Sequence, residues 1–241
     1  MSDVATLDAP RSAGIISTSN EELDKKIGGG LPRGSLTLIE GHSDAGKSVL
    51  AEQFAWGALQ GDLRVAVYST ENTVRNLLRQ AVSLGSDLSD YYLLGRLTIF
   101  PVQLPKDSIE PALVLSELYE HLRRQTEQDV IIVDSLTGAL ARASEEAGLD
   151  FFVRCKELCD KGRTVIHTLH SYALNESTLT RARAVCDAHL RLRIEQVGER
   201  LVKMLEVLKV RGAERSTGNI ISFDVEPGLG MRLIPLSRAK A

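Results

Sequence analysis

A short glycine-containing segment carries the clearest chemical signal in the sequence. It reads Gly41-His-Ser-Asp-Ala-Gly46-Lys47-Ser48 and meets the pattern G-x-x-x-x-G-K-[ST], between an apolar run and an apolar-periodic segment. The backbone N–H groups of such a loop, with the N-terminus of the helix that follows, form a nest for anions. The glycines allow close approach of the backbone, the lysine reaches the β- and γ-phosphates and the serine ligates Mg²⁺. The segment therefore predicts a site for ATP with Mg²⁺; the alternative is a glycine-rich turn that only caps a helix.

The magnesium ion needs a second protein anchor, usually a carboxylate at the end of a nearby strand. Asp134 ends the apolar run Val130–Val133, on a strand that we expect beside the phosphate loop. We therefore predict Ser48 and Asp134 as the metal-binding residues, although Asp134 could instead cap the turn that follows it. The residues predicted to contact the nucleotide are Gly41, His42, Ser43, Asp44, Ala45, Gly46, Lys47, Ser48 and Val49.

Hydrolysis also needs a group that orients or deprotonates the attacking water. Ser135 directly follows Asp134 and cannot act as this base, whereas Glu71 lies just past the apolar run at 65–69. Ligands bind along the carboxyl ends of the strands in open α/β sheets, so Glu71 is predicted as the catalytic base, beside Lys47. The alternative is that Glu71 only gains from its place near the N-terminus of a helix.

Two histidines lie on the apolar run after the Asp134 strand, His167 within it and His170 at its end. A polar residue at the end of that strand could sense the γ-phosphate, and His170 is the better placed of the two. A buried, hydrogen-bonded histidine fits the spacing equally well.

An α/β sheet must position these residues. Near-continuous apolar runs predict strands covered on both faces, and the amphipathic segments between them predict helices. The predicted strands are 36–40, 65–69, 97–102, 130–134 and 165–169, and the predicted helices are 48–60, 73–84, 111–124, 150–161 and 178–185. This alternation predicts a doubly wound, mainly parallel sheet with right-handed crossovers. Runs at 188–194, 201–210, 219–225 and 231–235 predict antiparallel strands that extend one edge.

Length and composition fit one α/β domain. The 241 residues are 43% hydrophobic and 25% charged, and the net charge of -3 gives no broad attraction for nucleic acid. We expect a disordered tail at 1–13 and a single ATP-binding domain at 14–241. The three cysteines lack CxxC spacing, and Cys155 and Cys159, four apart on a predicted helix, are expected in the core of a protein of the reducing cytoplasm. No apolar stretch approaches the roughly 20 residues that cross a bilayer, so membrane contact is expected only through partners.

Four segments resemble the KaiC branch of the RecA superfamily. They are 22–36 (ELDKKIGGGLPRGSL), 67–73 (VYSTENT), 130–135 (VIIVDS) and 208–212 (LKVRG), and the likeness spans about 14–235. Within that branch, 164–176 (TVIHTLHSYALNE) looks most like the FlaH group of the archaeal flagellum, or archaellum. The single-domain length agrees with this resemblance, since clock KaiC carries two such domains.

The resemblance implies a RecA-like fold, ATP with Mg²⁺ and several residue roles. Glu71 matches the first of a pair of glutamates, the usual catalytic base. Lys209 and Arg211 match residues that reach across a subunit interface to the γ-phosphate of the neighbour, where an arginine supplied in trans stabilises charge. From sequence alone, both also fit a solvated strand. Proteins of this branch commonly form hexameric rings, and FlaH-like members are implied to act in the cytoplasm beside the motor ATPase FlaI, under the membrane protein FlaJ.

Two residues depart from the family pattern. Asn72 stands in place of the second glutamate, and Asp44 puts a carboxylate inside the phosphate loop. That carboxylate would repel a triphosphate unless it points away or meets a cation. We therefore expect weak or regulated hydrolysis, with ATP acting as a conformational or assembly signal.

Two other functions stay open. A DNA-binding RecA paralogue is supported by a set of arginines that could line a groove, although such residues more often form a solvated face. The set is Arg181, Arg183, Arg191 and Arg193. A KaiC-like autokinase that phosphorylates its own Ser or Thr is the other alternative.

Overall fold

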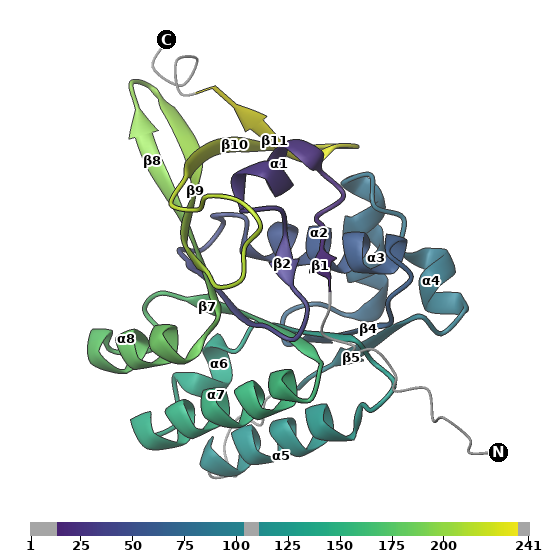
Figure 1. Cartoon of the computed structure of the whole chain (residues 1–241), viewed down its shortest axis with the longest axis vertical. Coiled ribbons are helices and arrows are strands. Elements are labelled where there is room, and N and C mark those ends of the chain that lie inside the picture. Colours follow the sequence, from purple (N-terminus) through teal and green to yellow (C-terminus); the bar gives the residue numbers. More distant parts are fainter. Residues whose placement is uncertain (1–13, 104–110, 236–241) are drawn as a thin grey trace, which may run out of the picture.

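The computed structural model describes residues 14–103 and 111–235, so the tail predicted at 1–13 lies outside the described residues. Within these residues the chain forms a nine-stranded sheet with helices on both faces (Figure 1). A separate two-stranded sheet joins β1 (Ile15–Ile16) to β2 (Leu31–Pro32). The predicted α/β architecture is confirmed.

The sheet is parallel through its centre and antiparallel at one edge. Its strand order is β11-β10-β9-β8-β3-β7-β6-β4-β5. The parallel strands are β3 (Leu36–Gly41), β4 (Val65–Ser69), β5 (Leu97–Pro101), β6 (Val130–Asp134), β7 (Thr164–His170) and β8 (Ala188–Val197). The antiparallel extension consists of β9 (Arg200–Val210), β10 (Ile220–Glu226) and β11 (Gly230–Ile234).

The run at 188–194, expected to be antiparallel, forms β8, which pairs in parallel with β3 and antiparallel with β9. The strand of Asp134 lies near the phosphate loop as expected, although it is not a direct neighbour of β3. β6, which ends in Asp134, does not pair with β3, because β7 lies between the two strands. Asp134 nevertheless reaches the start of the helix after the phosphate loop, since that helix crosses over the sheet toward β6. The sheet neighbour of β6 on its other side is β4, the strand that leads to Glu71.

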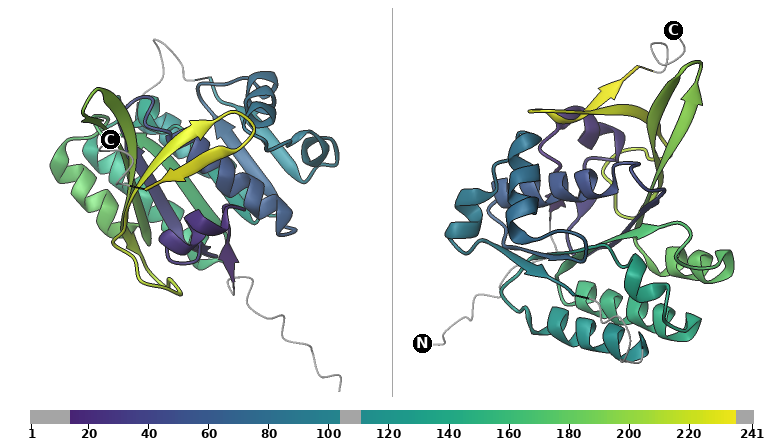
Figure 2. Two further views of the ribbon diagram at one scale, coloured as in Figure 1. Left: turned by 90° about the horizontal axis from the view of Figure 1, so that it is seen from above. Right: turned by 180° about the vertical axis from the view of Figure 1, so that it is seen from behind.

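Two apolar cores lie on opposite faces of the sheet (Figure 2). Strand side chains alternate between the faces, so Ile39 of β3 joins one core and Leu38 joins the other. One face is covered by α1 (Glu21–Lys26), α2 (Lys47–Gln60), α3 (Val74–Ser83) and α4 (Ser89–Leu93). The other is covered by α5 (Pro111–Arg124), α6 (Thr137–Leu140), α7 (Glu145–Asp160) and α8 (Glu176–Val185).

The C-terminal strands fold back over the N-terminal part of the chain. β10 and β11 lie above α1 and α2, while the long β8–β9 hairpin rises from the sheet beside them (Figures 1 and 2). Asn20 Nδ2 donates a hydrogen bond to Met231 O at 2.9 Å and so ties the start of α1 to β11.

The three cysteines are buried and unpaired; the core position predicted for Cys155 and Cys159 is confirmed, and Cys186 shares it. Burial raises the pKa of each thiol. Among the described residues, no helix combines the length and the apolar character that a membrane span requires.

Candidate functional site

The phosphate loop connects β3 to α2 beneath the C-terminal strands. Gly46 has a φ of 100°, a left-handed conformation that glycine adopts at no steric cost, and it precedes Lys47 at the first position of α2. Gly41 meets a different constraint, because a Cβ there would lie 2.1 Å from Leu192 O of β8. The glycines of the motif therefore serve backbone conformation at one end of the loop and close packing at the other.

Lys47 and Ser48 face the interior of this loop. The Lys47 ammonium donates a hydrogen bond to His42 O at 2.6 Å, and the side chain is almost fully buried. Burial lowers the pKa of Lys47, while the nearby carboxylates of Asp134, Glu71 and Asp44 act in the opposite direction. A partly desolvated cation inside a nest of N–H groups is suited to phosphate oxygens.

Asp134 lies directly beside Ser48. Its Oδ1 accepts hydrogen bonds from Ser48 Oγ at 3.1 Å and from Thr168 Oγ1 at 2.5 Å. Burial raises the pKa of Asp134, the two hydroxyl donors lower it, and the Glu71 charge raises it further. A bound cation would favour the ionised form of this carboxyl group. The oxygen donors of Ser48 and Asp134 fit Mg²⁺, which commonly takes one or two protein groups together with phosphate and water.

Glu71 reaches the same pocket from the end of β4. Ser135 Oγ lies 3.4 Å from Glu71 Oε1 and 3.1 Å from Thr137 Oγ1. The N-terminus of α3 has its own cap, since Thr73 Oγ1 accepts from the Asn76 N–H. The helix therefore does not depend on Glu71 for capping.

The two histidines of β7 have different surroundings. His170 lines the pocket, and burial followed by the Lys47 charge lowers its pKa. His167 is fully buried between Phe151 and Phe152, with ring centroids 5.5 Å away in each case. Burial lowers the pKa of His167 to about 3, and within the described chain neither ring nitrogen has a hydrogen-bond partner. The structure thus separates a pocket histidine from a core histidine.

These groups share one pocket of about 560 Å³, a size typical of small-molecule sites. Most of the predicted site residues contribute to its wall, together with residues that the sequence patterns did not single out. The lining residues are Ser43, Asp44, Gly46, Lys47, Ser48, Val49, Glu71, Asp134, Ser135, His170, Tyr172, Lys203 and Val225. Tyr172, Lys203 and Val225 were not predicted. Tyr172 belongs to the segment 164–176 that resembles the FlaH group but was not assigned a role, whereas Lys203 and Val225 come from strands without a local motif, and only the fold brings them here.

Lys209 and Arg211 do not line the pocket of their own chain. Lys209 Nζ donates to Arg183 O at 2.6 Å, and Arg211 Nη1 lies 3.9 Å from Asp187 Oδ1 with 60% of its side chain exposed. A role at the pocket of a neighbouring subunit stays a prediction.

The arginine set weighed for DNA binding is largely ion-paired. Arg183 and Arg191 contact the fully buried carboxylate of Glu40 at 2.7 and 2.8 Å. Burial alone would raise the pKa of Glu40, but His189, Arg183 and Arg191 outweigh it and bring the pKa to about 2. Arg193 contacts Glu206 at 2.9 Å and Glu195 at 2.5 Å. These arginines therefore do not present a row of uncompensated charge.

Together, three features define a RecA-like nucleotide-binding protein: the phosphate loop on a mainly parallel sheet, Asp134 at the end of a strand two places away, and Glu71 just past the strand after that. Residues 16–237 match the family described as ATPase: KaiC, and the chain belongs to this family.

Within that family the chain is similar to the archaeal flagellar ATP-binding protein FlaH of Sulfolobus acidocaldarius, with 33% identity over 94% of this chain and 100% of that protein. FlaH of Methanocaldococcus jannaschii is 35% identical over 90% of this chain and 93% of its own length. A crystal structure of the flagellar accessory protein FlaH from the latter organism superposes with a TM-score of 0.79 and covers 92% of this chain and 100% of that one. The resemblance to KaiC and FlaH inferred from sequence is confirmed.

Proposed function

We propose that this chain is the ATP-binding component of an archaellum motor, in which bound ATP with Mg²⁺ acts as an assembly or conformational signal. The observation that carries the proposal is the convergence of Lys47, Ser48, Asp134 and Glu71 on one pocket. The similarity to FlaH along nearly the whole chain supports the archaellum as its setting.

Each side chain has a distinct task in the proposed site. Lys47 binds the β- and γ-phosphates, and Ser48 with Asp134 holds the metal ion, which neutralises charge on the phosphates. Glu71 accepts the proton of the attacking water, and His170 contacts the γ-phosphate from the end of β7. Ser135 places a hydroxyl group beside Glu71 and helps to fix its carboxylate, and Thr137 in turn contacts the Ser135 hydroxyl.

Weak or stimulated hydrolysis follows from the two departures in the motif. Asn72 lacks the second carboxylate, and its own N–H donates to Ser69 Oγ at 3.0 Å. Asp44 places negative charge on the exposed side of the loop. Both residues favour slow turnover, as expected of a switch.

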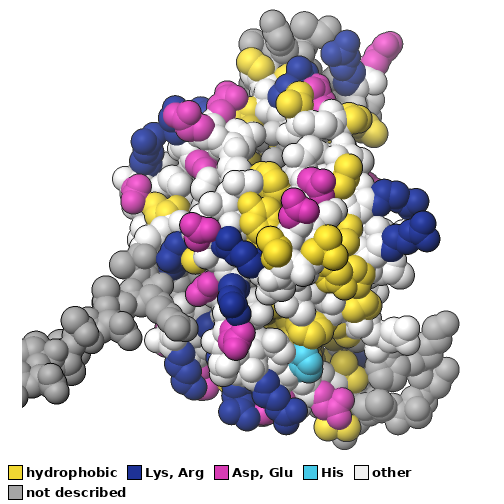
Figure 3. Space-filling model, turned by 90° about the vertical axis from the view of Figure 1, so that its right-hand side faces the viewer, with side chains coloured by type: hydrophobic (Ala, Val, Ile, Leu, Met, Phe, Trp, Pro, Cys, Tyr) yellow, Lys and Arg dark blue, Asp and Glu magenta, His cyan; other side chains and the backbone are white. Residues whose placement is uncertain are grey.

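Assembly is the proposed output of the switch. We propose a hexameric ring in which Lys209 and Arg211 approach the nucleotide of the adjacent subunit, at the cytoplasmic face of the motor. FlaI and the membrane protein FlaJ are the proposed partners. The face over α3 and α4 exposes apolar side chains, among them Val82, Leu93 and Leu94 (Figure 3). Exposed apolar patches are typical of protein contacts.

A pull-down against FlaI, with and without Mg-ATP, tests this proposal. The wild type is expected to capture FlaI more strongly with ATP, and Lys47→Ala to lose the ATP dependence. Lys161→Met, which alters an exposed lysine after α7, is the matched control. If the wild type captures no FlaI either with or without Mg-ATP, the motor role is contradicted, and the support that remains is for the ATP site of the family alone.

Autophosphorylation is a second candidate, favoured by the Ser135 hydroxyl beside Glu71. A carboxylate that accepts a proton from water could accept it from this hydroxyl. Incubation with γ-labelled ATP followed by mass spectrometry tests it: phosphate on Ser135 supports the autokinase, and an unmodified chain after turnover supports hydrolysis.

A further inference from the structure

Asp44 creates an electrostatic problem inside the phosphate loop. It is exposed, lines the pocket and has a φ of 58°, a left-handed conformation uncommon for residues other than glycine and asparagine. Its carboxylate shares the pocket with Glu71 and Asp134. A triphosphate entering this pocket adds further negative charge, so a cation close to Asp44, besides Lys47 and the magnesium ion proposed at Ser48 and Asp134, favours its binding.

Lys203 supplies a cation at this position. It belongs to β9 of the same chain and lines the same pocket, and its ammonium donates a hydrogen bond to the main-chain oxygen of Asp44. Lys47 donates to the oxygen of His42 on the inner side of the loop. Two lysines far apart in sequence thus hold two peptides of one loop.

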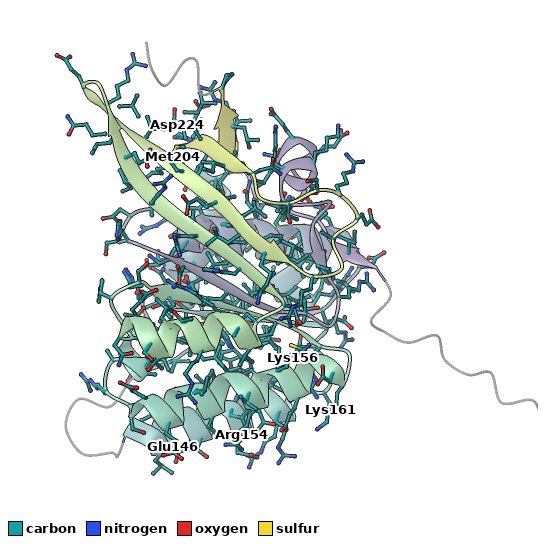
Figure 4. All side chains as sticks on the ribbon, turned by 60° about the vertical axis from the view of Figure 1, so that its left-hand side comes forward. Glu146, Arg154, Lys156, Lys161, Met204 and Asp224 are labelled. Atoms are coloured by element: carbon teal, nitrogen blue, oxygen red, sulfur yellow. The ribbon has the colours of Figure 1, made fainter. Side chains whose placement is uncertain are left out.

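The fold explains why Lys203 points toward the loop. Lys203 pairs with Phe223 of β10, and the Phe223 ring would lie 3.3 Å from a Cβ on Gly46. Side chains alternate along a strand, so the next residue, Met204, faces the other side of β9 (Figure 4). The C-terminal strands therefore form the outer wall of the phosphate loop, and Lys203 extends from that wall.

We propose that Lys203 is a positioning residue of the phosphate loop, which fixes the Asp44 peptide and offsets the Asp44 carboxylate so that the loop accepts a triphosphate. The inference rests on the ATP site proposed above. It adds a cation from the chain's own β9, distinct from Lys209 and Arg211, which lie outside this pocket. Loss of one charge-assisted contact of this kind lowers affinity about tenfold.

The test is a double-mutant cycle read by calorimetric titration with Mg-ATP. Lys203→Met is expected to weaken ATP binding about tenfold, and Lys203→Arg to bind almost as the wild type because it keeps the charge. Asp44→Asn tolerates the left-handed conformation and removes the carboxylate. In that background, Lys203→Met is expected to cost clearly less than tenfold, because the carboxylate is gone and only the contact with the main-chain oxygen of residue 44 is lost. Lys161→Met and thermal unfolding of each variant control for general charge and stability.

The outcomes separate this inference from the ATP site itself. Wild-type affinity in Lys203→Met, with binding lost in Lys47→Ala, overturns the role of Lys203 and leaves the ATP site supported. An equal loss from Lys203→Met in both backgrounds overturns the offset of Asp44. A wild-type chain that does not bind Mg-ATP overturns both proposals.

Discussion

The individual carboxylate groups around the nucleotide pocket differ in their exposure to solvent. Glu71 is exposed at the pocket, whereas Glu52 on α2 is 9% exposed and lies behind the Ser48–Asp134 pair. Burial, followed by the charge of Asp134, raises the pKa of Glu52 to about 8. Gln80 Nε2 lies 3.5 Å from its carboxylate. The two glutamates are therefore expected to respond differently to amide substitution.

Glu71→Gln is expected to preserve Mg-ATP binding and to lower hydrolysis at least 100-fold, because a general base contributes about 10² to 10⁴ in rate. Calorimetric titration and single-turnover phosphate release measure the two effects. Glu199→Gln, in the exposed β8–β9 turn, is the control. Hydrolysis that persists at the wild-type rate would show that another group activates the water.

Glu52→Gln is expected to stabilise the nucleotide-free protein at alkaline pH. The folded pKa of about 8 lies above the ordinary value of 4.5, so the unfolded chain ionises first as pH rises. Stability is therefore lost as pH rises between those two values and stays level above them. The amide removes this loss, which for a pKa raised from 4.5 to about 8 is on the order of 5 kcal/mol. Urea unfolding at pH 4, 6 and 8.5 measures it; a gain that is independent of pH would contradict the assignment.

At the residue scale, local patterns identify groups that a motif fixes in sequence. Ser48, Asp134 and Glu71 follow from the loop and from strand ends, and the structure brings them together. Lys203 and Glu52 carry no such signal. The position of Lys203 depends on how β9 folds over the phosphate loop, and the burial of Glu52 depends on which side of α2 faces β6.

At the scale of elements, the close contact between β3 and β8 shapes the phosphate loop. Gly41 pairs with Leu192, and the absence of a side chain lets the two backbones approach. Glu40, the preceding residue, binds Arg183 of α8 and Arg191 of β8. The loop thus starts from a strand end that is held on both sides.

Gly41→Ala is expected to destabilise the fold by about 2 kcal/mol or more, since its Cβ would meet backbone rather than a movable side chain. ATP binding is also expected to weaken, because the added methyl group forces β8 and the phosphate loop apart. Chemical denaturation checks the stability. Gly61→Ala, at the end of α2 with no contact closer than 3.4 Å, is the matched control, and equal effects of both changes would refute the packing argument.

Elements with long apolar runs were predictable, and short capped ones were not. Most strands, together with α2, α3 and α5, match their predicted ranges closely. α7 and α8 begin earlier than the apolar periodicity predicts, because Ser144 and Asn175 cap their first turns. The short α1, α4 and α6 lack a periodic stripe, and the position of β7 between β3 and β6 depends on tertiary packing.

At the scale of the whole molecule, Lys209 at the C-terminal end of β9 and Arg211 directly after it lie outside the pocket that Lys203, at the other end of the same strand, lines. If the proposed ring forms, Arg211→Ala is expected to lower ATP hydrolysis about 10³-fold in the assembled protein and to leave the monomer unchanged, because the proposed role of Arg211 is at the nucleotide of a neighbouring subunit. Hydrolysis measured across a range of protein concentrations, alongside light scattering, distinguishes the two states. An equal loss in monomers would contradict a role in trans.

The strand order also decides when the nucleotide site forms during synthesis on the ribosome. β3 ends at Gly41, but its partners β7 and β8 begin only at Thr164 and Ala188. Phe223 and Met231, from the last strands, complete the core around α2. Parallel pairing between strands far apart in sequence is slow, and it cannot begin before the partner strands have been synthesised. The ATP site is therefore among the last features to form, and polypeptides released before β10 lack its outer wall.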